Sequence, residues 1–255
     1  MKKYLGWRYC CFVVIWIITC SVKVDAASLG VWPINPRIDA PASATMVWVR
    51  NNSGTDDIVL QARVLKWSQT DNKEQYDDQD DLVVSPPLIT VKPGAQQIFR
   101  VVNRKGVIAS EADEKSFRLI IDEIPVEGKQ NQGPLNFQMR YSLPLFVGIP
   151  AAYTDKNAGH RLRAMAEGLR YRLIHQPQPA IEITNVGSFN ARLSRVRIDV
   201  KGASPIVVSE GLLGYVLVGA TKSWPIDAKH LTAVQQKEIT VVFEQDRQEL
   251  EIASQ

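Results

Sequence analysis

Residues 135–143 read LNFQMRYSL, and a large apolar side chain occupies every second position. Because successive side chains of a strand point to opposite faces, this period of two predicts a β-strand with one apolar and one polar face. The run is longer than the about five or six residues of a typical strand. It fits an ordinary half-buried strand, and it equally fits a long edge strand whose apolar face is covered by another chain.

Further strand patterns precede this run, and helical periodicity is scarce. Turn residues such as Asn51–Gly54 and Pro93–Gly94 separate the apolar stretches. We expect strands at residues 31–38, 45–49, 58–67, 88–91, 97–102, 117–124 and 135–147. About seven short strands at this spacing predict an immunoglobulin-like β-sandwich.

A break follows at Gly148–Ala152, where proline and small residues form a short connector. Beyond it, strand patterns resume at residues 169–175, 180–184, 192–200, 216–218, 221–226 and 238–243. We therefore expect an all-β protein with two immunoglobulin-like domains, at residues 27–148 and 149–255.

The first 26 residues have the three parts of a secretory signal peptide. Lys2, Lys3 and Arg8 give a positive start, residues 10–20 are apolar, and Val24–Ala26 suits a signal peptidase. The apolar run is shorter than the roughly 20 residues of a membrane-spanning helix. We expect cleavage after Ala26, with Ala27 as the neighbouring choice and an uncleaved membrane anchor as the alternative.

Removing residues 1–26 changes the charge and the cysteine content. The precursor has 30 basic and 27 acidic residues, of which four basic and one acidic lie in this segment, so the mature chain is about neutral. A nucleic-acid binder would need a basic stripe, which this balance argues against. All three cysteines, Cys10, Cys11 and Cys20, leave with the segment, so we expect no disulfide in the mature chain.

Motifs of catalysis and metal binding are missing from the sequence. His160, His175 and His230 stand in no zinc pattern, and no nucleophile elbow, P-loop or dinucleotide fingerprint occurs. The acidic segment 70–81 lacks the glycine and terminal glutamate of an EF-hand, so we expect a solvated loop rather than a calcium site. These observations predict a binding protein, not an enzyme, without cofactor or metal.

One arginine stands in an otherwise apolar strand. The stretch 116–125 reads SFRLIIDEIP, and Arg118 interrupts its apolar run. A charge in such a strand is costly unless it is paired or faces a cleft. Arg118 is therefore either bonded to a neighbour such as Asp122 or Glu123, or available to an anion.

These stretches together resemble a known family. The pattern SPP…V.PG..Q..R at residues 85–100, FRL.IDEIP at 117–125 and the alternating strand before a proline-containing linker are similar to the periplasmic chaperones of the chaperone–usher pilus pathway. Residues 185–187 and 214–219 extend the resemblance over nearly the whole mature chain. The ending RY.LP.FV at 140–147 looks closer to the archaic, or spore-coat-type, branch than to the type 1 and P pilus chaperones.

The resemblance implies a fold and a mechanism. Members of this family are boomerangs of two immunoglobulin-like domains in the periplasm. They lend a strand to a pilus subunit that lacks its own last strand, and they deliver the subunit to an outer-membrane usher. Matched position by position, Leu135, Phe137 and Met139 are the donor residues, with Tyr141 as a fourth.

The resemblance also implies a basic anchor for the C-terminal carboxylate of the subunit. Arg37 matches the family's basic position on the first strand. The lysine of the family's last strand has no clean match, because Ser142 stands at that position and Arg140 is the nearest base. Arg118 is the substitute candidate, since a guanidinium can bind a carboxylate through two hydrogen bonds.

Two other functions remain as alternatives. A secreted adhesive or carbohydrate-binding module would need an exposed aromatic platform, but we expect Trp32, Trp48, Trp67 and Trp224 in the core or at its rim. A hydrolase with catalytic residues from distant positions is the third possibility.

Overall fold

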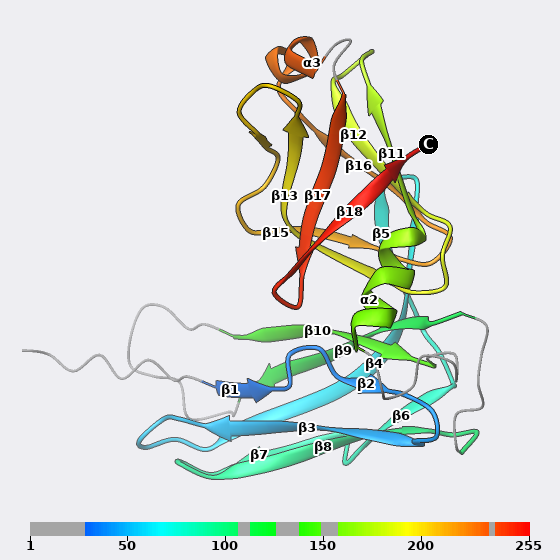
Figure 1. Cartoon of the computed structure of the whole chain (residues 1–255). Coiled ribbons are helices and arrows are strands. Elements are labelled where there is room, and N and C mark those ends of the chain that lie inside the picture. Colours follow the sequence, from blue (N-terminus) through cyan, green and yellow to red (C-terminus); the bar gives the residue numbers. More distant parts are fainter. Residues whose placement is uncertain (1–28, 107–112, 126–137, 149–157, 235–237) are drawn as a thin grey trace, which may run out of the picture.

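The structure is a computed structural model, and it describes residues 29–106, 113–125, 138–148, 158–234 and 238–255. One β-sandwich lies at the base, and a second stands on one of its faces, so that the molecule is L-shaped (Figure 1). This arrangement confirms the predicted all-β class with two immunoglobulin-like sandwiches. The predicted signal peptide, residues 1–26, lies outside the described residues.

The first sandwich consists of two sheets. The lower sheet has the order β1 (Leu29–Trp32), β3 (Ala44–Asn51), β8 (Gln96–Asn103) and β6 (Leu82–Ser85). The upper sheet has the order β2 (Arg37–Ile38), β10 (Arg140–Val147), β9 (Lys115–Ile124), β4 (Ile58–Thr70) and β5 (Lys73–Asp77), and β7 (Leu88–Val91) also pairs with β4.

The first core lies between these sheets. Val47 and Val49 point inward from β3, while Leu119 and Ile121 point inward from β9, and all four are fully buried. Their spacing of two follows from the alternation of side chains along a strand. The opposite faces of the two sheets are therefore left for solvent or for contacts with other parts of the protein.

The predicted strand at residues 31–38 is two strands in different sheets. β1 pairs with β3 in the lower sheet, whereas β2 runs parallel to β10 in the upper sheet. Pro33 and Pro36 lie between them and have no N–H to donate to a ladder. The chain therefore leaves one sheet here and joins the other.

The second sandwich is built from β11 to β18. Its strand order is β14 (Ile206–Val207), β13 (Ala191–Val200), β17 (Ile239–Gln245), β18 (Gln248–Ser254), β11 (Leu169–Ile174), β12 (Ala180–Asn185) and β16 (Thr221–Pro225), and β15 (Leu212–Val216) also pairs with β13. β15 replaces the strand that we predicted at residues 216–218. β18 pairs with β17 on one side and β11 on the other, and so joins the two layers.

Two helices were not predicted. Helix α2 (Ala158–Glu167) places Leu162 and Met165 in the second core, and α3 (Ala228–Val234) follows β16. The first core includes residues up to Val147, and the second begins at Leu162. The predicted domain boundary at 148/149 precedes residues 149–157, which lie outside the described residues, so this boundary stays a prediction.

The segment 70–81 is only partly the loop that we predicted. Its residues Lys73–Asp77 form β5, which pairs with β4 from Lys66 to Thr70. Asp71 and Asn72 have φ values of 51° and 62° and form the two-residue turn between the strands. Every side chain of β5 is exposed, so its polar sequence carries no strand alternation and the prediction missed it.

Candidate functional site

The three predicted arginines lie on one face of the upper sheet. Arg118 stands opposite Pro144, Arg37 opposite Phe146 and Arg140 opposite Asp122. Residues opposite each other share a face, and these positions are an even number of residues apart along β10. This face is turned toward the second sandwich (Figure 1).

Arg118 stacks on aromatic rings where the two sandwiches meet. Its guanidinium carbon lies 3.8 Å from the ring centroid of Trp67 and 5.7 Å from that of Tyr215. Its Nη1 donates a long hydrogen bond of 3.5 Å to the Ser142 carbonyl, and its buried Nε has no hydrogen-bond partner among the described residues. Of the two alternatives for Arg118, an ion pair with Asp122 or Glu123 is not found among the described residues, and Asp122 binds Arg63 and Arg140 instead.

Arg37 is the partner of a buried carboxylate. Its Nη2 donates to Glu114, whose side chain is 1% exposed, and its Nε lies 3.4 Å from Asp39. Burial lowers the pKa of Arg37 to about 10, and the nearby charge of Arg161 from α2 acts in the same direction. Glu114 also accepts hydrogen bonds from the backbone and side-chain nitrogens of Asn190 in the second sandwich, at 3.0 and 2.8 Å.

Arg140 lies away from the other two arginines. It donates to Asp122, which also accepts a 2.7 Å bond from Arg63. Burial acts to raise the pKa of Asp122, but these two arginines outweigh it and hold the pKa below its usual value. The six residue steps from Arg140 to Phe146 span about 20 Å of strand. The structure therefore brings Arg37 and Arg118 to one end of the sheet and leaves Arg140 at the other.

An aromatic cluster joins the sandwiches between Arg37 and Arg118. Trp67 and Phe146 of the first sandwich stack with centroids 6.0 Å apart, and the ring of Tyr215 meets Trp67 edge-on at 5.3 Å. Arg37 lies 5.5 Å from the Phe146 ring. The two cations therefore flank the same pair of stacked rings.

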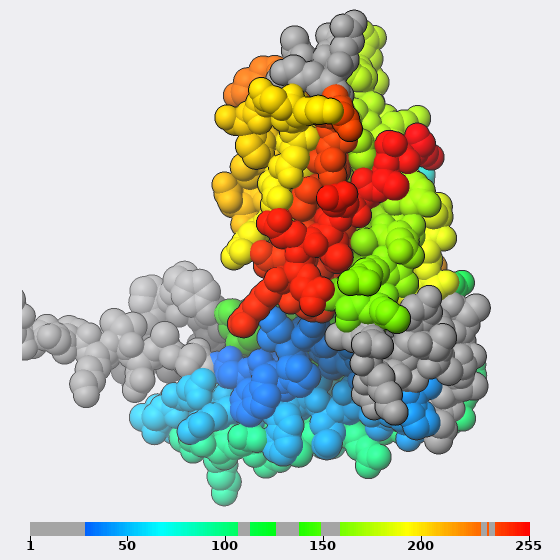
Figure 2. Space-filling model, in the orientation of Figure 1, coloured from blue at the N-terminus to red at the C-terminus, as the bar shows by residue number. Residues whose placement is uncertain are grey.

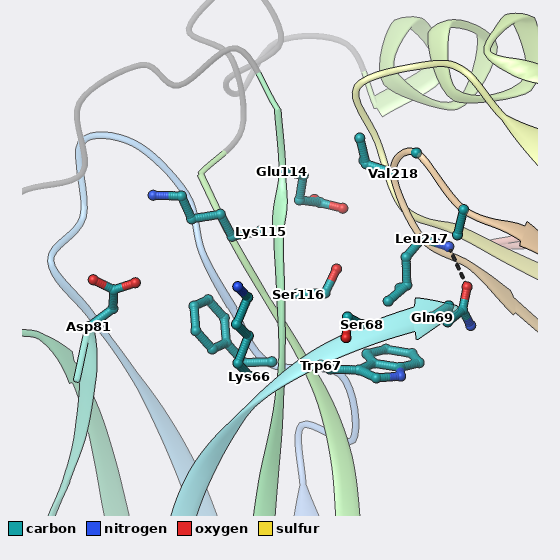
Figure 3. Close-up of a pocket in the computed structure, with 13 residues that line it drawn as sticks. Lys66, Trp67, Ser68, Gln69, Asp81, Glu114, Lys115, Ser116, Leu217 and Val218 are labelled. Atoms are coloured by element: carbon teal, nitrogen blue, oxygen red, sulfur yellow. Dashed lines mark hydrogen bonds between the residues drawn. The ribbon is translucent and has the colours of Figure 1, made fainter. Parts of the chain in front are cut away.

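A cavity of about 420 Å³ opens beside this cluster (Figure 3). Across it, Gln69 binds the second sandwich twice: its amide donates to the Tyr215 carbonyl and accepts from the Leu217 N–H, both at 2.9 Å. In the space-filling view the second sandwich rests directly on the first, and the turn between β17 and β18 reaches down to it (Figure 2). The two sandwiches are thus in direct contact beside Arg37 and Arg118.

The predicted donor residues lie on and before β10. Leu135 and Phe137 fall outside the described residues. Met139 is 46% exposed, while Tyr141 packs against the first core, where burial raises its pKa. β9 pairs with β10 along its whole length, but β2 reaches only Phe146 and Val147 on the other side. In the described chain, the backbone of residues 140–145 therefore has a free edge.

Sequence reasoning missed Glu114 and Tyr215. Glu114 lies in a polar stretch of the sequence, and Tyr215 lies in the other sandwich, so no local pattern relates either of them to the arginines. Among the described residues, no group of acidic, histidine or cysteine side chains could hold a metal ion. Nor does any helix in this part of the protein have the length and apolarity to cross a membrane.

Comparisons with known proteins agree with this geometry. Residues 37–152 match the family model described as "Pili and flagellar-assembly chaperone, PapD N-terminal domain". The chain is 30% identical to a chaperone in the complex of CsuC with the tip subunit CsuE, from the archaic chaperone–usher Csu pili of Acinetobacter baumannii. That match covers 90% of this chain and 100% of the other, with a TM-score of 0.68. The chain belongs to the pilus-assembly chaperone family.

More distant members share the fold. The CupB2 chaperone of Pseudomonas aeruginosa is 18% identical, with a TM-score of 0.57 over 88% of this chain and 100% of that one. A chain of the SafA pilin–SafB chaperone complex of Salmonella enterica is 17% identical, with a TM-score of 0.58 over 89% and 97%. A search of curated protein sequences found no match. The predicted family, including its archaic branch, is confirmed by the match to the Csu chaperone.

Proposed function

We propose that this pilus chaperone holds an incomplete pilus subunit by lending it the free edge of β10. The observation that carries the proposal is this edge, with Met139 exposed at its start and residues 140–145 unpaired on one side in the described chain. A strand added here gains backbone hydrogen bonds along the edge, and apolar side chains on one face give selectivity.

The donor side chains continue the face of the first core. By alternation, Met139 and Tyr141 share a face with Leu143 and Leu145, which are buried in that core. In the sequence, Leu135 and Phe137 continue this spacing of two. Burying one large apolar side chain contributes about 1.5–3 kcal/mol, so two or three of them account for stable capture. Tyr141, already packed against the chaperone's own core, would lie where the two cores meet.

Arg118 is the favoured anchor for the carboxylate of the subunit. It has no carboxylate partner among the described residues, whereas Arg37 is bonded to Glu114 and Arg140 to Asp122. Binding at Arg118 would break no ion pair of the described residues. Arg37, beside the same aromatic rings, contributes positive potential, and Arg140 is expected to contribute least.

The remaining parts of the proposal concern location and partners. The chain would enter the periplasm through cleavage of residues 1–26, carry subunits to an outer-membrane usher, and act without catalysis. This follows from its family and from the signal-peptide pattern of its first residues.

The experiment is co-expression with subunits encoded beside its gene, followed by purification of the complex. Met139→Asp places a charge on the donor face and should abolish co-purification while the chaperone still folds. Gln138→Asp adds the same charge to the opposite face and is the matched control, which should retain the subunit. Equal retention by both variants would show that the donor strand is wrongly assigned.

A further inference from the structure

The β4–β5 hairpin of the first sandwich extends beside the second sandwich (Figure 1). At its tip, the side chain of Asn72 donates to the carbonyl of Ser223 at 3.0 Å and accepts from the N–H of Ser223 at 2.9 Å. Ser223 lies on β16, the strand at one end of its sheet. The amide of Asn72 thus occupies the place of a neighbouring strand, and it fixes the hairpin to the second sandwich.

A buried cation lies next to this contact. Lys222 of β16 is 9% exposed, and its ammonium donates to the Asn72 carbonyl at 2.9 Å and to Glu74 Oε1 at 3.0 Å. The other oxygen of Glu74 accepts the indole N–H of Trp67 at 2.5 Å. One carboxylate therefore connects a lysine of the second sandwich to a tryptophan of the first.

Trp67 in turn supports Arg118. The indole is 3% exposed, its N–H is bound by Glu74, and Tyr215 and Phe146 pack against the ring. Arg118 lies 3.8 Å from that ring, and its one hydrogen bond in the described chain is long. The orientation of its guanidinium therefore depends mainly on the position of the ring.

We propose that Lys222 and Glu74 are positioning residues that hold Trp67, and through it Arg118, in the geometry that binds a carboxylate. The proposal rests on the proposed function of Arg118 as the anchor. A guanidinium binds a carboxylate best through two parallel hydrogen bonds, so a loosened ring lowers affinity without removing any group that touches the subunit. The second sandwich would thus act on an anchor that belongs to the first.

The test uses the full mature chain and a subunit from the same gene cluster, purified in denaturant and refolded with each chaperone variant. Lys222→Met and Glu74→Gln should each weaken the complex about tenfold, a factor that corresponds to ~1.4 kcal/mol. Lys222→Arg keeps a cation at this site and should recover most of the affinity. Lys201→Met, which removes an exposed pair with Glu238 in the second sandwich, is the control and should have no effect.

A double-mutant cycle separates positioning from a structural role. If Lys222 acts through Arg118, then Lys222→Met adds nothing to Arg118→Ala. The proposal would be overturned if Lys222→Met lowered the affinity for the subunit as much in the Arg118→Ala background as in wild type. It would also be overturned if Lys222→Met bound the subunit with wild-type affinity while Arg118→Ala bound it more weakly. Wild-type affinity of Arg118→Ala would instead refute the anchor itself, and the positioning role with it.

Discussion

Replacing Arg37 with methionine should destabilise the chaperone strongly, because it leaves a buried carboxylate without its cation. Glu114 is almost completely buried, and Arg37 donates to one of its oxygens. Methionine fills much of the same volume and keeps an apolar contact with the ring of Phe146. The change therefore tests the charge more than the packing.

The size of the loss follows from the partners that remain. Breaking a buried ion pair by removing one partner costs about 3–5 kcal/mol. The two hydrogen bonds from Asn190 to the other oxygen of Glu114 persist and offset part of this cost. We therefore expect a loss of about 3 kcal/mol, at the low end of this range. The double variant Arg37→Met with Glu114→Gln carries no buried charge and should recover to within about 1 kcal/mol of wild type.

The assay is urea unfolding, followed both by tryptophan fluorescence and by far-UV circular dichroism, because two sandwiches can unfold in separate steps. Trp32 and Trp48 report on the first sandwich, Trp224 on the second, and Trp67 on the contact between them. A loss below about 0.5 kcal/mol for Arg37→Met, or a double variant no more stable than the single one, would refute the reasoning.

Three further predictions concern the contacts between and within the sandwiches. Burial acts to raise the pKa of Glu74, but hydrogen bonds from Trp67, Lys222 and Gln69 outweigh it and leave the pKa lowered. The stability that ionised Glu74 contributes is therefore complete above the unfolded pKa of about 4.3, and it is lost as the pH falls through the lower folded pKa. In urea titrations at decreasing pH, wild type should lose more unfolding free energy than Glu74→Gln. An equal dependence of the unfolding free energy on pH in both proteins would contradict this. Asn72→Gly preserves the positive-φ turn but removes the bonds to Ser223, so hydrogen exchange at the Ser223 amide should accelerate, and unchanged protection would argue against the hairpin contact. Gly168→Ala places a methyl group 2.6 Å from the Gly187 Cα, so its thermal unfolding should show a loss of about 1–3 kcal/mol, which wild-type stability would disprove.

The fold was predictable where one face of a strand is buried. In β3 and β9 the residues of the first core recur every second position, and the predicted strands lie within the observed ones. The prediction failed where both faces are polar, as in β5, and where prolines divide one apolar run, as between β1 and β2. Helix α2 was missed although it places Leu162 and Met165 in the core, because these are the only large apolar side chains among its ten residues.

The candidate site was predictable only in part. The sequence singled out Arg118 because a lone charge in an apolar strand is unusual, and the family pattern singled out Arg37. Nothing local indicated that Arg118 would rest on Trp67, or that Glu114 would bond to Arg37 from 77 residues away. Such partners come from distant strands and from the other sandwich. Which residues meet is therefore set by the topology of the sheets, and the spacing of residues along the sequence does not reveal it.

The distribution of charge on this face distinguishes its arginines. Asp122 binds both Arg63 and Arg140, and Glu114 and Asp39 flank Arg37, so each of these cations already has a carboxylate. An incoming carboxylate would have to displace one of them or remain at a distance. At Arg118 it meets a guanidinium held by aromatic rings, which attract the cation without using its hydrogen-bond donors. Aromatic support therefore keeps this arginine in place and leaves it able to bind, which is the combination that a carboxylate anchor requires.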